Sequence, residues 1–464
     1  MSSGPEAASD KALLGEFGAA VAAGNAGRAL AIARRLPEAL RQRFDIMAHE
    51  ADLSGKLGYH EEEVALLRQL IAREPAMPSL QVTLANALKT IGRRDEAIAA
   101  VKEALAIRAD YGKAWWVLAE LKNYRFEDAE VEAMQSALAV VESPADRLHL
   151  HFALGRAFEQ RGQVEQAFTH YAQGNALSGS SMRPEAVTVS ERVDRAIATY
   201  THGFFTERAG LGHDSNAPIF IVGLHRAGST LVEHILASHS AIEATSELPI
   251  IGQLLRAVVT DRNLPGATPL AKLASLDRER LRELGAEYLE RASDYRSTGE
   301  PRFIDKMPAN WLNLGFIQLI LPNATIIDAR RHPMAAGLSN FRQNFGSGAD
   351  WTYSLDSIGR YYGDYLRLMR HFDRVLPGKV HRVINERLID DFEPEVRKIL
   401  DHVGVAFEPA CLEFHLSTRP VRSASSEQVR RPINREGVDQ WRAFEPWLGP
   451  LKEALGRALE DWQA

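Results

Sequence analysis

The stretch that decides the fold spans residues 218–239 and reads PIFIVGLHRAGSTLVEHILASH. Its apolar run IFIV is typical of a buried strand, and an amphipathic helix is expected from about Leu231. Between them lies a loop bounded by Gly223 and Gly228 and followed by Ser229 and Thr230. This arrangement predicts a phosphate cradle, because glycines let backbone N–H groups approach an anion and a helix N-terminus carries about half a positive charge.

The spacing of these glycines matches the first part of the nucleotide-triphosphate P-loop, G-x-x-x-x-G. Ser229, however, stands where that motif requires the lysine that reaches the β- and γ-phosphates, so ordinary ATP hydrolysis is disfavoured. An ordinary strand-to-helix turn that binds nothing is the alternative interpretation of the loop.

A second candidate anion site lies in ATIIDARRHPMAAGLSNF, residues 324–341. An expected strand ends at Arg330 and Arg331, and Ser339 follows Arg331 by eight residues. A helix that starts near Pro333 would bring arginine and hydroxyl together, and this pair could grip a phosphate. The alternative is that the two arginines are a solvated strand end.

The remaining pattern predicts how the chain is divided. From residue 217 to 464, short apolar strands (PIFIVG, RFIDK, ATIIDAR and VHRVIN) alternate with amphipathic segments, which indicates an α/β domain with a parallel sheet. Residues 179–216 combine breaker clusters with a helical stretch and are interpreted as a helical linker.

Glycines recur in the N-terminal third at a fixed interval. Gly24, Gly58 and Gly92 are 34 residues apart, and Gly162 lies 70 beyond Gly92, each between two amphipathic stretches. This pattern, with further matching features at Ala97, Ala167 and Pro75, resembles the tetratricopeptide repeat. The resemblance implies an α-solenoid over residues 10–178 whose concave face binds a peptide or protein. A plain helical bundle that only stabilises its neighbour is the alternative.

Composition limits the remaining classes. The 464 residues include 55 basic and 61 acidic ones, a net charge of −6, so we expect no nucleic-acid partner and no anionic membrane partner. Cys411 is the only cysteine, and His234 and His239 lack metal-ligand spacing, so we expect no intrachain disulfide and no metal. No leader or membrane-spanning pattern is recognised, and we expect a soluble, cytoplasmic protein.

The GLHRAGSTL loop, the Arg331-to-Ser339 spacing and the late segment SSEQVRRPIN together resemble the sulfotransferase family over about residues 217–447. Within it, the likeness is to tyrosylprotein sulfotransferases and their bacterial repeat-fused relatives. The resemblance implies a P-loop-type α/β domain and the donor 3′-phosphoadenosine 5′-phosphosulfate. It assigns the 5′-phosphosulfate to Arg226, Ala227, Gly228, Ser229 and Thr230, the 3′-phosphate to Arg331 and Ser339, and closure over the nucleotide to Ser425 or Ser426 and Arg431. Asn385 stands where the family often has tyrosine.

The same resemblance supplies candidates for the transfer step. Glu247 follows Arg226 by 21 residues, the offset of the family's catalytic glutamate, and is assigned as general base, with burial expected to raise its pKa. Lys306 matches the family's lysine before a proline and would neutralise the bridging oxygen, with Arg226 sharing the developing charge. Locally, Glu247 could merely open a helix, and Lys306 could be a solvated strand end.

The sequence therefore predicts a two-domain enzyme that transfers a sulfuryl group to an acceptor hydroxyl, peptide tyrosine being one acceptor that the resemblance suggests. The repeats would bind a protein partner. One alternative is a P-loop kinase-like phosphotransferase with Asp305 or Asp328 holding Mg²⁺. The other is a non-catalytic repeat scaffold with a degenerate nucleotide fold.

Overall fold

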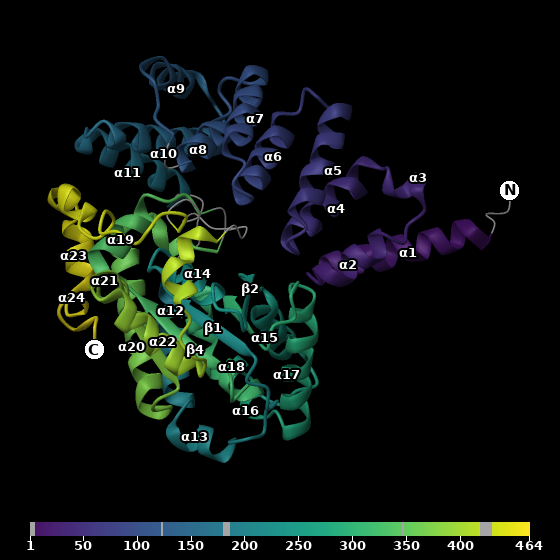
Figure 1. The fold of residues 1–464 in the computed structure, drawn as a ribbon, viewed down its shortest axis with the longest axis vertical. Helices are drawn as coiled ribbons and strands as arrows, with labels where there is room; N and C mark the ends of the chain where they lie inside the picture. The colour runs from purple at the N-terminus through teal and green to yellow at the C-terminus, as the bar shows by residue number, and fades with distance from the viewer. Residues whose placement is uncertain (1–4, 122–123, 180–185, 346–347, 418–428) are drawn as a thin grey trace. The chain divides into compact units, whose positions relative to one another are not determined.

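The computed structural model describes residues 5–121, 124–179, 186–345, 348–417 and 429–464 (Figure 1). The chain forms two compact units. The first reaches Ala153 and includes Glu290–Tyr295, and the second contains Leu154–Leu289, Arg296–Ser417 and the described residues from 429 onward. The units thus divide within one helix, earlier than the expected end of the repeats at 178.

Helical hairpins make up the first unit, as the repeat pattern predicted. Its helices are α1 (Pro5–Ala22), α2 (Ala26–Ala33), α3 (Glu38–Arg41), α4 (Phe44–Lys56), α5 (His60–Arg73), α6 (Pro78–Thr90), α7 (Arg94–Ile107), α8 (Gly112–Glu120), α9 (Asp128–Val140) and the start of α10 (Pro144–Gln160). Gly24, Gly58, Gly92 and Gly162 end helices with φ of 67°, 86°, 79° and 72°, respectively. These left-handed conformations favour glycine, so the predicted turn positions are confirmed.

Small side chains let consecutive helices of the first unit pack closely. Ala97 and Ala104 of α7 and Ala85 of α6 are fully buried. The helix faces that carry these alanines and neighbouring leucines form the core of the repeats, so stability here comes from the stacking of hairpins.

A parallel five-stranded sheet organises the second unit. Its strands are β1 (Pro218–Gly223), β2 (Ile242–Ser246), β3 (Arg302–Lys306), β4 (Thr325–Arg330) and β5 (Val380–Ile384). The order is β2-β3-β1-β4-β5, and every pairing is parallel. The predicted α/β class is confirmed, although β2 has no strong apolar pattern and was not predicted. All five carboxyl ends meet at one edge, where ligands of such sheets bind.

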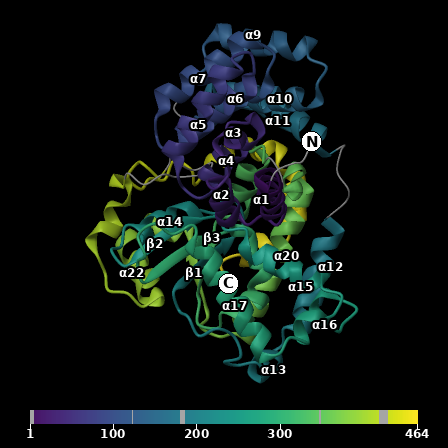
Figure 2. The same ribbon diagram turned by 90° about the vertical axis from the view of Figure 1, so that its right-hand side faces the viewer.

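Helices cover both faces of this sheet, as a buried parallel sheet requires. Ile219 and Ile221 of β1 pack with α14 (Ser229–Ala237) and α22 (Phe392–Val403). Phe220, which points the other way, contacts Tyr288 of α17 (Arg278–Ser293) with 5.5 Å between ring centroids. Figure 2 shows α14 and α22 on one side of the strands and α17 and α20 (Leu355–Val375) on the other.

The other elements of the second unit are α11 (Val164–Gly179), α12 (Ala186–Thr199), α13 (His202–Glu207), α15 (Ile250–Thr260), α16 (Pro269–Ala274), η1 (Pro308–Asn313), α18 (Leu314–Ile320), α19 (Pro333–Phe341), η2 (Asp350–Tyr353), α21 (Asn385–Asp390), η3 (Pro409–Leu416), η4 (Gln440–Trp447), α23 (Gly449–Leu455) and α24 (Ala458–Asp461). The expected linker, 179–216, contains α12 and α13, and α12 packs against α20.

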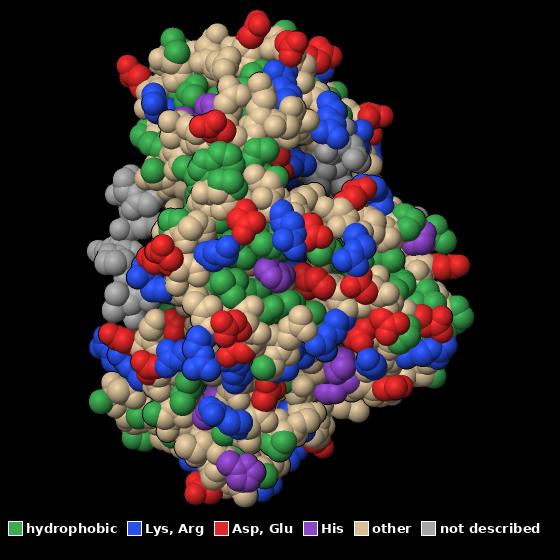
Figure 3. All heavy atoms as spheres, turned by 90° about the vertical axis from the view of Figure 1, so that its left-hand side faces the viewer, with side chains coloured by type: hydrophobic (Ala, Val, Ile, Leu, Met, Phe, Trp, Pro, Cys, Tyr) green, Lys and Arg blue, Asp and Glu red, His purple; other side chains and the backbone are tan. Residues whose placement is uncertain are grey.

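No helix in the described ranges is both long and apolar enough to cross a bilayer. Acidic and basic side chains are interspersed on the face in Figure 3.

Candidate active site

Each strand of the sheet delivers one candidate group to the same edge. The phosphate loop follows β1, Glu247 follows β2, and Lys306 ends β3. Arg331 follows β4, and Asn385 follows β5. Because parallel strands end together, residues that are far apart in the sequence converge there.

Close backbone approaches fix the path of the loop after β1. Gly223 has φ 138°, and a Cβ atom at this position would lie 2.3 Å from the carbonyl oxygen of Ala329. Gly228 has φ 96°, and a Cβ atom there would lie 2.6 Å from Oδ1 of Asn385. Gly223 is therefore required by space as well as by conformation, and Gly228 by its conformation. Arg226 adopts φ 65°, an uncommon value for a residue other than glycine.

The two predicted anion-binding sites, which are the loop after β1 and the Arg331–Ser339 pair, form one connected structure. Arg226 Nε donates to Ser339 Oγ at 3.1 Å, and Arg331 Nη1 donates to the carbonyl oxygen of Arg226 at 3.3 Å. Ser339 lies on α19, whose first residue is Pro333, as the sequence predicted. Ser339 therefore holds the loop arginine, a contact that the sequence did not indicate.

A cavity of about 170 Å³ opens beside these arginines. The predicted residues that line it are Arg226, Gly228, Ser229, Thr230, Arg331 and Arg431. Asn385 lines it as well, whereas Ala227, Ser339, Glu247 and Lys306 are not among its lining residues. Ser425 and Ser426 lie outside the described residues. The structure thus gathers most of the predicted cofactor-binding residues around one space.

Arg331 is held by its neighbours yet keeps one donor free. Its Nη2 donates to the carbonyl oxygen of Gly437, while its buried Nε has no hydrogen-bond partner among the described residues. Burial lowers the pKa of Arg331 to about 10, so the guanidinium is still charged at neutral pH. A buried charged donor without a partner is costly, and an anion would satisfy it.

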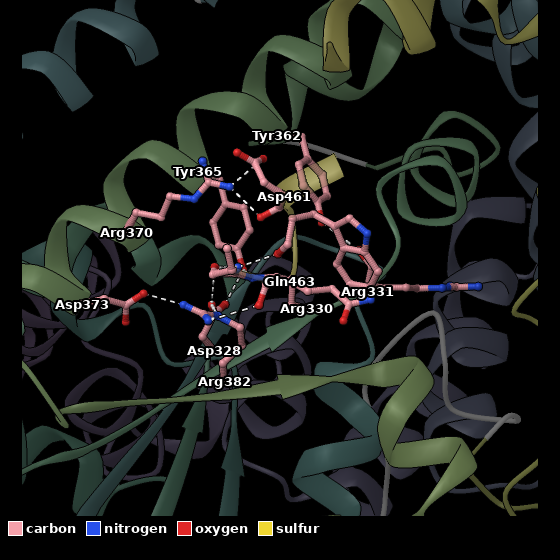
Figure 4. A network of polar contacts seen from close by, with 12 residues as sticks. Asp328, Arg330, Arg331, Tyr362, Tyr365, Arg370, Asp373, Arg382, Asp461 and Gln463 are labelled. Carbon is pink, nitrogen blue, oxygen red and sulfur yellow. Dashed lines mark hydrogen bonds and ion pairs between the residues drawn. The ribbon is translucent and has the colours of Figure 1, made fainter. Parts of the chain in front are cut away.

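Arg330, by contrast, is committed to the fold. It is 1% exposed and donates through Nη2 to Asp328 at 2.6 Å and through Nε to the hydroxyl of Tyr365 at 3.2 Å. The Tyr362 hydroxyl donates to the carbonyl oxygen of Arg331 at 2.7 Å. Figure 4 shows this network and the Arg331 side chain extending away from it. The network therefore anchors the end of β4, and of the two arginines only Arg331 lines the cavity.

Arg431 carries a neighbour of opposite charge. Its Nη2 and Nη1 atoms contact the two carboxylate oxygens of Glu436 at 2.8 and 3.0 Å, and both residues line the cavity. Solvent screens an exposed pair of this kind, so an incoming anion can displace Glu436.

Lys306 and Glu247 form the predicted transfer pair. Lys306 Nζ donates to Glu247 Oε1 at 2.5 Å and lies 3.9 Å from Glu233 Oε2. Burial disfavours the ammonium, but Glu247 and Glu233 outweigh it and raise the pKa of Lys306. The expected burial of Glu247 is wrong, because its side chain is 41% exposed whereas that of Lys306 is 3% exposed.

A backbone irregularity explains the direction of Glu247. The register of β2 with β3 shifts between Ala244 and Ser246, and Ser246 has φ 137°, a strained value for serine. The Thr245 hydroxyl donates to the carbonyl oxygen of Ile304 at 2.7 Å and secures this shift. A bulge re-aims the residue that follows it, and here that residue is Glu247.

Asp305 and Asp328, the carboxylates considered for Mg²⁺, are both fully buried and engaged. Asp305 accepts from the Tyr288 hydroxyl at 3.0 Å and from the Leu248 N–H at 3.4 Å, and Asp328 pairs with Arg330. Within the described ranges, no group of three or more His, Cys, Asp or Glu side chains could hold a metal ion. Neither carboxylate is presented at the cavity.

Asp305 makes stability depend on pH. Burial raises its pKa to about 7, so the folded protein retains a proton that the unfolded chain loses near pH 4. Stability from this group is therefore present below about pH 4 and is lost as the pH rises to about 7. We expect Asp305→Asn to flatten the decline in Tm between about pH 4 and pH 7. An unchanged Tm profile in that variant, measured by thermal unfolding, would contradict the expectation.

Two further contacts, one to the phosphate loop and one to the start of α19, have no signal in the sequence. Asn340 Nδ2 donates to the carbonyl oxygen of His225 at 2.8 Å, and Glu386 Oε1 accepts from the His332 N–H at 3.1 Å. The His225 ring packs against Phe345 and Trp351, and burial lowers the pKa of this imidazole. Ile221 of β1 lies opposite Lys306 of β3, so the transfer pair and the loop after β1 follow neighbouring strands.

Comparison with known proteins yields matches for both units. Residues 218–409 match the sulfotransferase family model, and residues 78–111 match a tetratricopeptide repeat model. An uncharacterized protein of Aquifex aeolicus (strain VF5) is 29% identical over 410 residues, which is 86% of this chain and 53% of that protein. The chain thus spans about half the length of this relative.

Two shorter matches involve named sulfotransferases. A Caenorhabditis briggsae protein named "Putative protein-tyrosine sulfotransferase" is 23% identical over 228 residues, which is 48% of this chain and 80% of that one. The solved sulfotransferase domain from the Synechococcus PCC 7002 olefin synthase is 25% identical, with a TM-score of 0.36, and covers 50% of this chain and 89% of its own.

Proposed function

We propose that the protein is a sulfotransferase with 3′-phosphoadenosine 5′-phosphosulfate as its donor, because residues 218–409 match the sulfotransferase family model and residues 78–111 match a tetratricopeptide repeat model. The donor supplies an activated sulfuryl group, which an acceptor hydroxyl receives. The observation that carries the proposal is the single cavity lined by both Arg226 and Arg331. Two arginines that line one cavity suit a nucleotide with phosphates on two sides of its ribose.

The residues at the cavity fit such a donor. The backbone N–H groups from Gly228 to Thr230 and the side chain of Arg226 would hold the 5′-phosphosulfate. The spare Nε of Arg331 would bind the 3′-phosphate, with Ser339 close by through Arg226. Arg431 would leave Glu436 and close over the nucleotide together with Ser425 or Ser426.

Glu247 and Lys306 would carry the transfer. The exposed Glu247 carboxylate is accessible to an acceptor hydroxyl and would accept its proton as oxygen attacks sulfur. The S–O bond to the nucleotide phosphate breaks as the new bond forms, and Lys306 and Arg226 would neutralise the charge on the departing oxygen. Lys306 is charged in the folded state because Glu247 and Glu233 raise its pKa.

The repeats would bind the acceptor. Tetratricopeptide arrays bind polypeptides on their concave face, so the acceptor is proposed to be a protein hydroxyl, with tyrosine as the first candidate. The relative named for protein-tyrosine transfer supports testing tyrosine first.

Incubation with donor labelled in its sulfuryl group tests the proposal. We expect label to move to a tyrosine-containing peptide, or to another hydroxyl in a panel of serine peptides, sugars and small phenols. Omission of Mg²⁺ and addition of EDTA should leave the rate unchanged, because side chains and backbone amides neutralise the donor. Transfer of phosphate from labelled ATP, with no transfer of the sulfuryl label, would contradict the proposal.

A further inference from the structure

The end of helix α19 is held by α11. Asn175, which is 2% exposed, donates through Nδ2 to the carbonyl oxygen of Phe341 at 2.9 Å and to that of Tyr171 at 2.8 Å. Phe341 is the last residue of α19, where carbonyl groups have no donor within the helix. Asn175 therefore caps α19 from a helix that is 166 residues away along the chain.

Glu159 of α10 makes a second link to the same turn. It forms an ion pair with Arg342, the residue after α19, and accepts from the Tyr171 hydroxyl at 2.7 Å. The side chains of Glu159 and Arg342 are each 15% exposed, so solvent screens the pair only partly. The Phe168 ring stacks on Phe341 with 5.7 Å between centroids.

The residues immediately before this turn hold the phosphate loop. Ser339 accepts from Arg226 Nε, and Asn340 donates to the carbonyl oxygen of His225. Four consecutive residues, 339–342, thus join the loop on one side and the α10–α11 hairpin on the other. A shift of this turn would move both contacts to the loop.

We propose that Asn175 and Glu159 are positioning residues for the donor site, acting through α19 on Arg226 and the phosphate loop. This inference rests on the proposed function of that site. It assigns the final repeat-like hairpin, from Leu154 onward, to the catalytic unit, in agreement with its place in the second compact unit. The hairpin is then part of the binding machinery for the donor and not only a surface for a protein partner.

Asn175→Ala in the full-length chain tests the inference. We expect the Kd for 3′-phosphoadenosine 5′-phosphate and the KM for the donor to rise about 5- to 10-fold, as for loss of one well-placed hydrogen bond, with kcat much less affected. Glu159→Gln, whose side chain is less buried, should act in the same direction and covers the case in which Asn175→Ala fails to fold. Thr268→Ala, which removes the N-cap of α16, is the control and should leave Kd and KM unchanged.

A double-mutant cycle gives the decisive readout. If Asn175 acts through α19, its substitution should raise Kd by a smaller factor when Ser339 is already alanine than in the wild-type background, because coupled residues are not additive. The inference would be overturned if the effects of Asn175→Ala and Ser339→Ala on Kd were fully additive. It would also be overturned if Asn175→Ala and Glu159→Gln both kept the wild-type Kd. Failure of the wild-type protein to bind the bisphosphate would instead overturn the proposed function, so the two failures are distinguishable.

Discussion

Glu247→Gln is expected to lower kcat by about 10²- to 10⁴-fold, because the amide cannot accept the acceptor proton in the transition state. The Kd for 3′-phosphoadenosine 5′-phosphate should stay within about 2-fold of the wild-type value, since Glu247 does not line the cavity. Single-turnover transfer of labelled donor and calorimetric titration measure the two quantities.

Glu413→Gln, an exposed substitution on η3, is the matched control and should behave as wild type. Because Glu247 is the nearest counter-charge to the Lys306 side chain, which is 3% exposed, its loss should also lower Tm, so folding of the variant is checked by thermal unfolding before kcat is compared. Normal turnover in Glu247→Gln, or lost nucleotide binding with turnover retained, would remove Glu247 as the base.

Arg331→Ala is expected to weaken binding of 3′-phosphoadenosine 5′-phosphate by about 10²-fold or more, because charge-assisted hydrogen bonds contribute about 1.5–3 kcal/mol each. The affinity for adenosine 5′-phosphate should change much less, since that nucleotide lacks the 3′-phosphate. The ratio of the two dissociation constants, measured by titration, therefore reports on the interaction between Arg331 and the 3′-phosphate.

Arg331→Lys should recover only part of the affinity, because a single ammonium cannot reproduce the guanidinium fork. Arg442→Ala, an exposed arginine on η4, is the control. If Arg331→Ala weakened both nucleotides equally, Arg331 would not be the 3′-phosphate group, and the effect would reflect its bond to the Arg226 carbonyl oxygen.

The sequence was sufficient where local rules operate. Strand, glycine loop and helix follow one another in residues 218–237 as predicted, because apolar runs and left-handed glycines encode them directly. The turn glycines of the repeats were predictable for the same reason. The convergence of Arg226 and Arg331 followed from the parallel sheet, whose strand ends share one edge.

Other features depend on tertiary contacts that no local pattern carries. The exposure of Glu247 follows from the bulge at Ser246, which depends on the pairing of β2 with β3. Asn175 looks like an ordinary polar residue of a repeat helix, yet it caps a helix 166 residues away. Arg330 and Arg331 are adjacent and chemically identical, and only the position of Asp328 and Tyr365 separates the structural arginine from the one at the cavity.

The central claim is that one cavity binds an adenosine with phosphates on both its 3′ and 5′ sides. Calorimetric titration of the wild-type protein with 3′-phosphoadenosine 5′-phosphate, adenosine 5′-phosphate and ATP with Mg²⁺ tests it most directly. The account predicts that the bisphosphate binds tightest, by about 100-fold or more over adenosine 5′-phosphate. Equal affinity for the two adenosine phosphates, or tighter binding of ATP with Mg²⁺, would contradict it.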